Sequence, residues 1–123
     1  MTFGASPDDV YEAIMDSRKH SQFTGCAAKI SPRVGGSFTA MDSLRGKNVE
    51  LRPGRKIVQT WQCDLDGWPK AHFSVLTITL RPVRSGTRLD FKQAHVPADC
   101  ARKIAASWTK YYWRPLKRML GKD

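Results

Sequence analysis

The chain has 123 residues, enough for one domain with its own hydrophobic core, and its hydrophobic and charged fractions are those of an ordinary globular protein. Its 21 Lys and Arg residues exceed its 11 Asp and Glu residues and give a net charge of +10, which favours anionic partners. The basic residues are dispersed and no nucleic-acid recognition motif accompanies them, so specific nucleic-acid binding is not expected. The densest basic group is expected on the last helix, at Lys110, Arg114, Lys117, Arg118 and Lys122. The basic residues are interpreted as a solubilising face or, alternatively, as a surface for an acidic protein partner.

The first residues lack the basic and apolar regions of a signal peptide, and no apolar run approaches the length of a membrane span. Cys26, Cys63 and Cys100 are odd in number and far apart, which indicates reduced thiols rather than a disulfide framework. We therefore expect residues 1–123 to form a single cytoplasmic domain.

A helix is predicted to begin at Ser6, because Ser is a good N-cap and Pro7 suits the first helical position. Its apolar stripe fades into the polar run at residues 16–20. A second, short helical turn is predicted at residues 21–24, and residues 1–5 are expected to form a brief edge strand.

Strand-forming residues alternate with turn residues from residue 26 onward, which predicts a run of short strands. In the last predicted strand Leu89 and Phe91 alternate with charged residues, a pattern typical of a strand with one buried and one solvent-exposed face. The predicted strands span residues 27–30, 37–41, 46–51, 55–63, 71–82 and 87–95.

A long aromatic helix is predicted at residues 98–120. Apolar residues recur there at spacings of three and four, so they share one face, and Pro115 should kink the helix or loosen its preceding turn. A single helix after a run of antiparallel strands indicates an α+β domain in which the helix lies across a curved sheet. The buried face is predicted to comprise Ile104, Trp108, Tyr111 or Tyr112, Pro115 and Met119.

No arrangement of polar residues indicates catalysis. The carboxylate pairs at residues 8–9 and 64–66 are expected in a helix cap and a loop rather than in a cleft. No two histidines have metal-ligand spacing on one helix and no Cys-His cluster is present, so neither a metal nor a cofactor is expected. His72 and His95 are expected to meet at the end of the hairpin formed by the last two strands, as a solvated pair or, alternatively, as a ligand-binding or acid–base pair.

Short motifs follow one another along nearly the whole chain: VGGSF at 34–38, IVQTW at 57–61, WP at 68–69, SV at 74–75 with Ile78 and Leu80, GTRL at 86–89, VP at 96–97 and W-x-x-YYW-x-x-L at 108–116. Together they resemble the C-terminal domain of activators of the heat-shock protein 90 ATPase, within the START-like (helix-grip, SRPBCC) superfamily. The resemblance implies a curved antiparallel sheet of about six strands wrapped around a long C-terminal helix, two short helices near the N-terminus, and a cavity between sheet and helix.

The chain departs from the family pattern at His95 and Ser107, where glycine is common, and in its short first strand. The eukaryotic co-chaperones of the family also carry an additional N-terminal domain, for which these 123 residues have no room.

The candidate site is the space between sheet and helix. Its aromatic residues are interpreted either as pure core packing or as the lining of a pocket for a small hydrophobic molecule or lipid, in which a few polar groups orient the ligand. The predicted lining residues are Phe38, Gln59, Trp61, Ser74, Leu76, Ile78, Phe91, Gln93, Trp108, Tyr111 and Tyr112.

The hypothesis favoured by the sequence is non-enzymatic binding of a small hydrophobic ligand, without a cofactor. The first alternative is an interaction module that contacts an acidic chaperone surface through its basic face. The second is an enzyme of the cyclase or hydrolase type that some START-like proteins have become.

Overall fold

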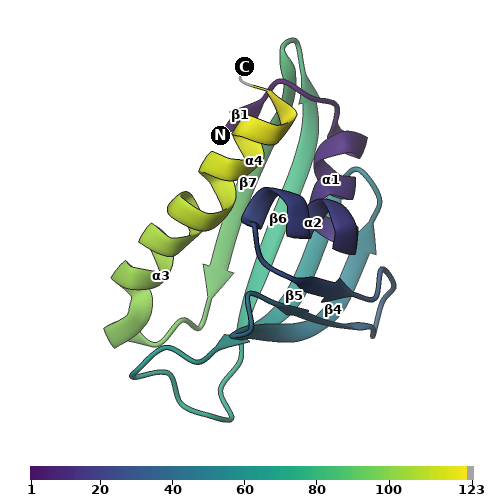
Figure 1. The fold of residues 1–123 in the computed structure, drawn as a ribbon. Coiled ribbons are helices and arrows are strands. Elements are labelled where there is room, and N and C mark those ends of the chain that lie inside the picture. The colour runs from purple at the N-terminus through teal and green to yellow at the C-terminus, as the bar shows by residue number, and fades with distance from the viewer. Residues whose placement is uncertain (122–123) are drawn as a thin grey trace.

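The computed structural model describes residues 1–121, in which seven antiparallel strands form one curved sheet in the order β1-β7-β6-β5-β4-β3-β2. A helical segment runs diagonally across the sheet, and two short helices lie on the same side (Figure 1). This is the predicted helix-grip arrangement, and the brief edge strand before the first helix is also confirmed. The strands are β1 (Thr2–Phe3), β2 (Ala28–Ile30), β3 (Ser37–Ala40), β4 (Leu44–Arg52), β5 (Lys56–Cys63), β6 (Ser74–Val83) and β7 (Gly86–Ala94).

Strand β4 contains a β-bulge. The register between β4 and β5 shifts between Asn48 and Glu50, and such a bulge bends the strand and increases its twist. At Gly46 the strands approach so closely that an added Cβ would clash with the carbonyl oxygen of Thr60. Glycine is therefore required at this position of β4.

Helix α1 (Pro7–Met15) begins as predicted, with the Ser6 hydroxyl accepting a bond of 3.2 Å from the backbone N–H of Asp9. The second helix begins four residues before the predicted turn at residues 21–24. The Asp16 carboxylate accepts a bond of 3.0 Å from the N–H of Lys19, and this second cap starts α2 (Ser17–Thr24) immediately. Gly25 ends α2 at a φ of 75°.

Strand β6 begins at Ser74, three residues later than predicted, because side chains rather than a neighbouring strand hold the preceding backbone. The carbonyl of His72 accepts bonds from the Trp68 indole at 2.8 Å and from the Gln62 amide at 3.1 Å. The imidazole Nε2 of His72 lies 2.6 Å from the carbonyl oxygen of His95, which confirms that the two histidines meet at the end of the β6–β7 hairpin. His95 adopts a φ of 64°, a conformation that explains why glycine suits this position.

The C-terminal helical segment comprises a 3₁₀ turn η1 (Ala98–Cys100), α3 (Ala101–Trp108), a π-helical turn η2 (Thr109–Trp113) and α4 (Arg114–Leu120). The wide turn ends two residues before Pro115, which has no N–H to donate and whose ring would clash with the carbonyl four residues earlier in a regular α-helix. The predicted loosening at Pro115 is therefore confirmed.

A π-helical turn contains one residue more than an α-helical turn, so the buried face of α4 is rotated relative to the position that a continuous α-helix would give it. Tyr112, Trp113 and Leu116 are buried, whereas Tyr111 is 40% exposed. The expectation that the buried face ends at Met119 is wrong, because Met119 is 37% exposed and Leu120 packs against the core in its place. Lys122, the last residue of the predicted basic group, lies outside the described residues.

Candidate functional site

The space between sheet and C-terminal helical segment is occupied mainly by aromatic rings. The ring of Trp108 lies 4.7 Å from that of Phe91, 4.5 Å from that of Tyr112 and 5.8 Å from that of Trp61, measured between centroids. These rings pack in tilted arrangements that are favourable for aromatic pairs. The middle of the predicted cavity is therefore core.

The polar side chains expected to orient a ligand bond instead to one another. The Trp108 indole donates to Oε1 of Gln93 at 2.9 Å, the Gln93 amide donates to the Ser74 hydroxyl at 2.9 Å, and that hydroxyl donates to the carbonyl of Trp61. The Gln59 amide donates to Oδ1 of Asn48 at 2.9 Å. Within residues 1–121 no buried side-chain nitrogen or oxygen is left without a partner, so the interior offers no free polar group to a ligand.

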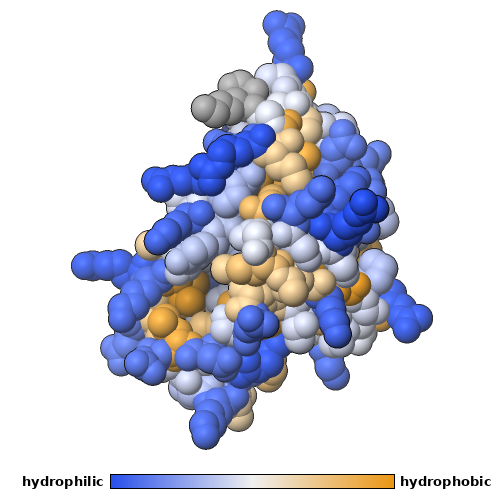
Figure 2. All heavy atoms as spheres, viewed as in Figure 1, coloured by the Kyte–Doolittle hydropathy of each residue, from blue (hydrophilic) through white to orange (hydrophobic). Residues whose placement is uncertain are grey.

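An apolar cavity of about 150 Å³ remains beside α3 and opens to solvent. Figure 2 shows apolar side chains gathered on this part of the surface, at the lower left, among hydrophilic ones. Four of the predicted residues line it, namely Trp61, Trp108, Tyr111 and Tyr112. The other lining residues are Met41, Ser43, Leu44, Cys63, Leu65, Ile104 and Ser107.

The remaining predicted residues lie elsewhere. Phe38, Gln59 and Ile78 face an internal space of about 30 Å³, which is enough for a single water molecule. Phe91 and Gln93 line a groove between β7 and α3. Ser74 and Leu76 are fully buried and line none of these three spaces. The structure thus divides the eleven residues among separate environments.

Some of the missed lining residues carried a sequence signal. Ile104 belongs to the helical stripe of the last helix, and Cys63 alternates with Trp61 on β5. Met41 gave no such signal, because it reaches the cavity from the β3–β4 turn, where Met41 and Asp42 have φ values of 52° and 58°. These values are those of a tight hairpin turn.

His20 is a buried polar residue that the sequence did not single out. Its Nδ1 lies 2.9 Å from the carbonyl oxygen of Ile14 and its Nε2 lies 2.9 Å from the Tyr112 hydroxyl. Because the carbonyl can only accept, Nδ1 carries the proton and Nε2 accepts from Tyr112. Burial lowers the pKa of His20 and raises that of Tyr112 well above its usual range, so both groups are held neutral.

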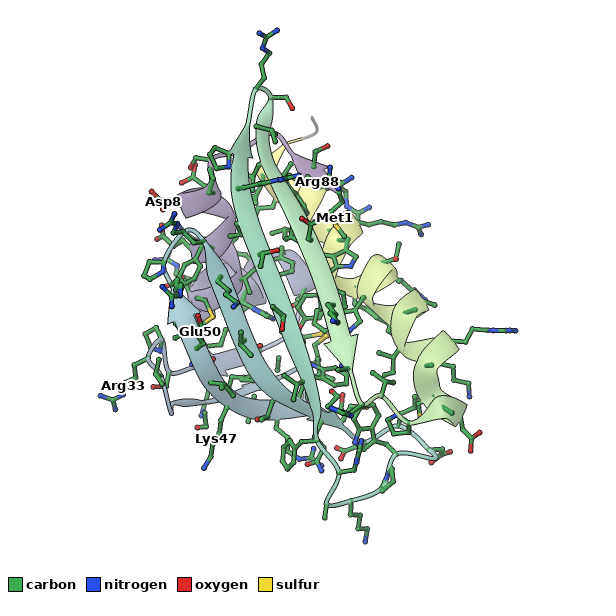
Figure 3. All side chains as sticks on the ribbon, turned by 180° about the vertical axis from the view of Figure 1, so that it is seen from behind. Met1, Asp8, Arg33, Lys47, Glu50 and Arg88 are labelled. Carbon is green, nitrogen blue, oxygen red and sulfur yellow. The ribbon has the colours of Figure 1, made fainter. Side chains whose placement is uncertain are left out.

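Positive charge accumulates on the C-terminal helical segment. Residues 101–120 contain six cations and no acidic residue. Among the described residues none of these six forms an ion pair, whereas charges on the sheet do: Arg88 pairs with Asp90, and Glu50 pairs with Arg52 and Lys56. Figure 3, seen from behind, labels Arg88 and Glu50. The six cations are Arg102, Lys103, Lys110, Arg114, Lys117 and Arg118.

Residues 1–121 also bear on metal binding and on membrane spans. No group of three or more His, Cys, Asp or Glu side chains is placed to hold a metal ion. None of the helices there combines the length and the apolar character that crossing a membrane requires.

Comparison with known proteins places the chain in one family. The model of the family described as "Activator of Hsp90 ATPase homolog 1-like protein" matches residues 4–121. The activator of 90 kDa heat shock protein ATPase homolog 1 of Homo sapiens is 27% identical over 121 residues, which cover 98% of this chain and 35% of that protein. The homolog of Dictyostelium discoideum is 34% identical over 113 residues, covering 88% of this chain and 28% of the relative. The chain thus spans about a third of the length of the curated relatives it matches.

Solved structures have the same fold. The crystal structure of an HSP90 activator from Plasmodium falciparum matches with a TM-score of 0.89 at 21% identity, covering 98% of this chain and 92% of that one. A protein from Chromobacterium violaceum matches with a TM-score of 0.80 at 26% identity, covering 100% and 94%. The helix-grip fold expected from the sequence is confirmed by these matches.

Proposed function

The chain belongs to the family of Activator of Hsp90 ATPase homolog 1-like proteins, and on this premise we propose that it docks on an acidic surface of an Hsp90-type chaperone. The docking face is the exposed side of the C-terminal helical segment, residues 101–120. The curated relatives named as activators are about three times as long as this chain, and docking is the function we assign to this domain. A cytoplasmic location is part of the proposal.

The observation that carries the proposal is the unpaired charge of this segment. Six cations without an acidic residue produce a positive potential that no local ion pair cancels, and such a potential steers association with an acidic surface. Stabilisation of the helix explains the positions of only some of these six cations. Lys117 and Arg118 suit the negative end of the helix dipole, but Arg102 and Lys103 lie in the first turn of α3, where the dipole disfavours cations.

The test is a titration of the labelled protein with a purified Hsp90-type chaperone at several ionic strengths. The affinity is expected to fall steeply between about 0.01 M and about 0.15 M salt, where the Debye length shortens from about 30 Å to about 8 Å. The variant carrying Arg114→Glu and Lys117→Glu should bind about tenfold more weakly. The matched control carries Lys29→Glu and Lys47→Glu, which reverse two exposed charges on β2 and β4 and change the net charge equally. Equal affinities for all three proteins would refute the docking face.

A second candidate function is binding of a free hydrophobic small molecule in the cavity beside α3. Its apolar lining and its volume of about 150 Å³ favour this alternative, because a cavity of similar size in another protein binds benzene. Binding of a small aromatic probe, measured by the fluorescence of Trp61 and Trp108, should then be nearly independent of salt.

A further inference from the structure

We infer that the cavity beside α3 is a socket for one aromatic or large aliphatic side chain of the docked chaperone, presented by a segment with acidic residues next to that side chain. This inference rests on the proposed docking function and names the feature of the partner that the face recognises. It also assigns the cavity to a partner side chain rather than to a free ligand.

The size of the cavity is that of a single side chain. Its volume of about 150 Å³ is close to that of a cavity that holds benzene and lies well below the roughly 300–1,000 Å³ of sites for larger ligands. Trp61, Trp108 and Tyr111 contribute large apolar surfaces to its wall. Energetic hot spots of protein interfaces are typically such anchor side chains in desolvated pockets.

The wall of the cavity suits an apolar occupant. The indole N–H of Trp108 is bonded to Gln93, and the hydroxyl of Tyr112 is bonded to His20. An apolar side chain would therefore leave neither of these groups without a partner.

The mouth of the cavity lies within the proposed docking face. Ser107 and Tyr111 line the cavity from the helix, one turn apart. The Nζ atom of Lys110 lies 5.2 Å from the ring centroid of Tyr111, and Lys103 lies one turn before Ser107. A segment that inserted its side chain here would thus pass beside two cations.

On the sheet side of the mouth, unlike the helix side, a cation is paired and an acidic residue is exposed. Arg45, next to the lining residue Leu44, is paired with Asp64 at 2.8 Å, and Asp42 is exposed in the β3–β4 turn. The acidic residues of the partner are therefore expected on the helix side of the socket, and not over the β3–β4 turn.

The test compares two changes that block or remove the socket while keeping all six cations. Ser107→Phe places a ring in the mouth, and Tyr111→Ala removes part of the wall. Each should weaken chaperone binding by at least about fivefold with the same salt dependence as the unaltered protein. Met119→Ala is the control for Tyr111→Ala, because Met119 is 37% exposed, lies on the same helical segment and does not line the cavity. Thr79→Phe, an exposed site on β6, is the control for Ser107→Phe.

The outcomes separate the two claims. If charge reversal at Arg114 and Lys117 weakens binding but Ser107→Phe and Tyr111→Ala match their controls, the socket is wrong and the docking face stands. If Ser107→Phe abolishes binding of the small aromatic probe and leaves chaperone affinity unchanged, the cavity is a site for a free ligand and the inference is overturned. If charge reversal also has no effect, the docking function itself fails. Urea unfolding of each variant establishes that the effects do not come from misfolding.

Discussion

The imidazole of His20 and the hydroxyl of Tyr112 meet at 2.9 Å, joining α2 to the π-helical turn η2 across 92 positions of the chain. This contact holds the C-terminal helical segment against the N-terminal helices. It is made in η2, the π-helical turn at which the buried face of that segment is rotated. Its neighbours are aromatic, with the rings of Phe23 and Tyr112 5.7 Å apart. The bond is therefore formed away from water, where a lost partner is costly.

Lowering the pH below neutrality should destabilise the protein through His20. Because burial lowers the pKa of this residue in the folded state, the unfolded chain binds a proton near its usual pKa of about 6.5 before the folded chain does. The stabilisation is fully present above that pH and is lost as the pH falls from there toward the lowered pKa. Urea denaturation between about pH 7.5 and about pH 5 should show this fall, and His20→Gln should abolish it.

The control for that experiment is His95→Gln, which changes an exposed imidazole and should leave the pH dependence intact. The carboxylates of Glu50 and Asp64 titrate in a separate, more acidic window, because their hydrogen bonds to Arg52 and Arg45 lower their pKa values. An unchanged slope in the His20→Gln variant would show that His20 is not the titrating group.

Replacing Tyr112 by Phe should reduce the free energy of unfolding by about 1–3 kcal/mol, because Nε2 of His20 is left buried without its donor. The ring itself is retained, so packing against Trp108 is preserved. Tyr11→Phe removes a hydroxyl from a half-buried tyrosine of α1 and is the matched comparison. A similar small effect for both variants would contradict the role assigned to the His20–Tyr112 bond.

Replacing Trp108 by Ala should cost about 3–5 kcal/mol of unfolding free energy, the range found for removal of a large buried aromatic side chain. Trp108 is 7% exposed and contacts rings on both the sheet and the helical segment. Trp108→Phe should cost less, because a six-membered ring remains in the core and only part of the packing is lost together with the bond to Gln93. A loss below about 1 kcal/mol for Trp108→Ala would mean that the helical segment does not pack as described.

Thiol titration should distinguish the three cysteines. Cys26 is exposed, whereas Cys63 and Cys100 are buried, and burial raises the pKa of the Cys63 thiol. In the native protein only Cys26 should react rapidly with a disulfide reagent, and all three thiols should react after unfolding in urea. Rapid native reaction at Cys63, which lines the cavity, would indicate that the cavity opens more widely than the structure shows.

The order and type of the elements could be predicted because their signals are local. The cap at Ser6 and Pro7 and the alternation around Leu89 and Phe91 need no tertiary information. The start of β6 could not be predicted, because residues 71–73 continue a strand-like pattern while Trp68 and Gln62 bind the His72 carbonyl.

The site was less accessible from the sequence for two physical reasons. If the helical period continued unchanged through Pro115, Met119 would lie on the buried face. The π-helical turn contains one residue more than an α-helical turn, and the local sequence pattern does not reveal this extra residue. The bonds that engage Gln93 and Ser74 depend on the register of β6 and β7 and on the position of Trp108 above them. The residue types predicted a pocket with free polar groups. In the structure those groups form hydrogen bonds with one another inside the core.

The most direct test of the docking face is lysine footprinting of the complex with an Hsp90-type chaperone. Lys103 and Lys110 lie on the proposed face, whereas Lys29 and Lys47 are exposed lysines on β2 and β4, and Lys47 is labelled in the rear view of Figure 3. Acetylation rates measured by mass spectrometry should fall at Lys103 and Lys110 when the chaperone is bound and should stay unchanged at Lys29 and Lys47. Protection of Lys29 and Lys47 with unchanged rates at Lys103 and Lys110 would contradict the account.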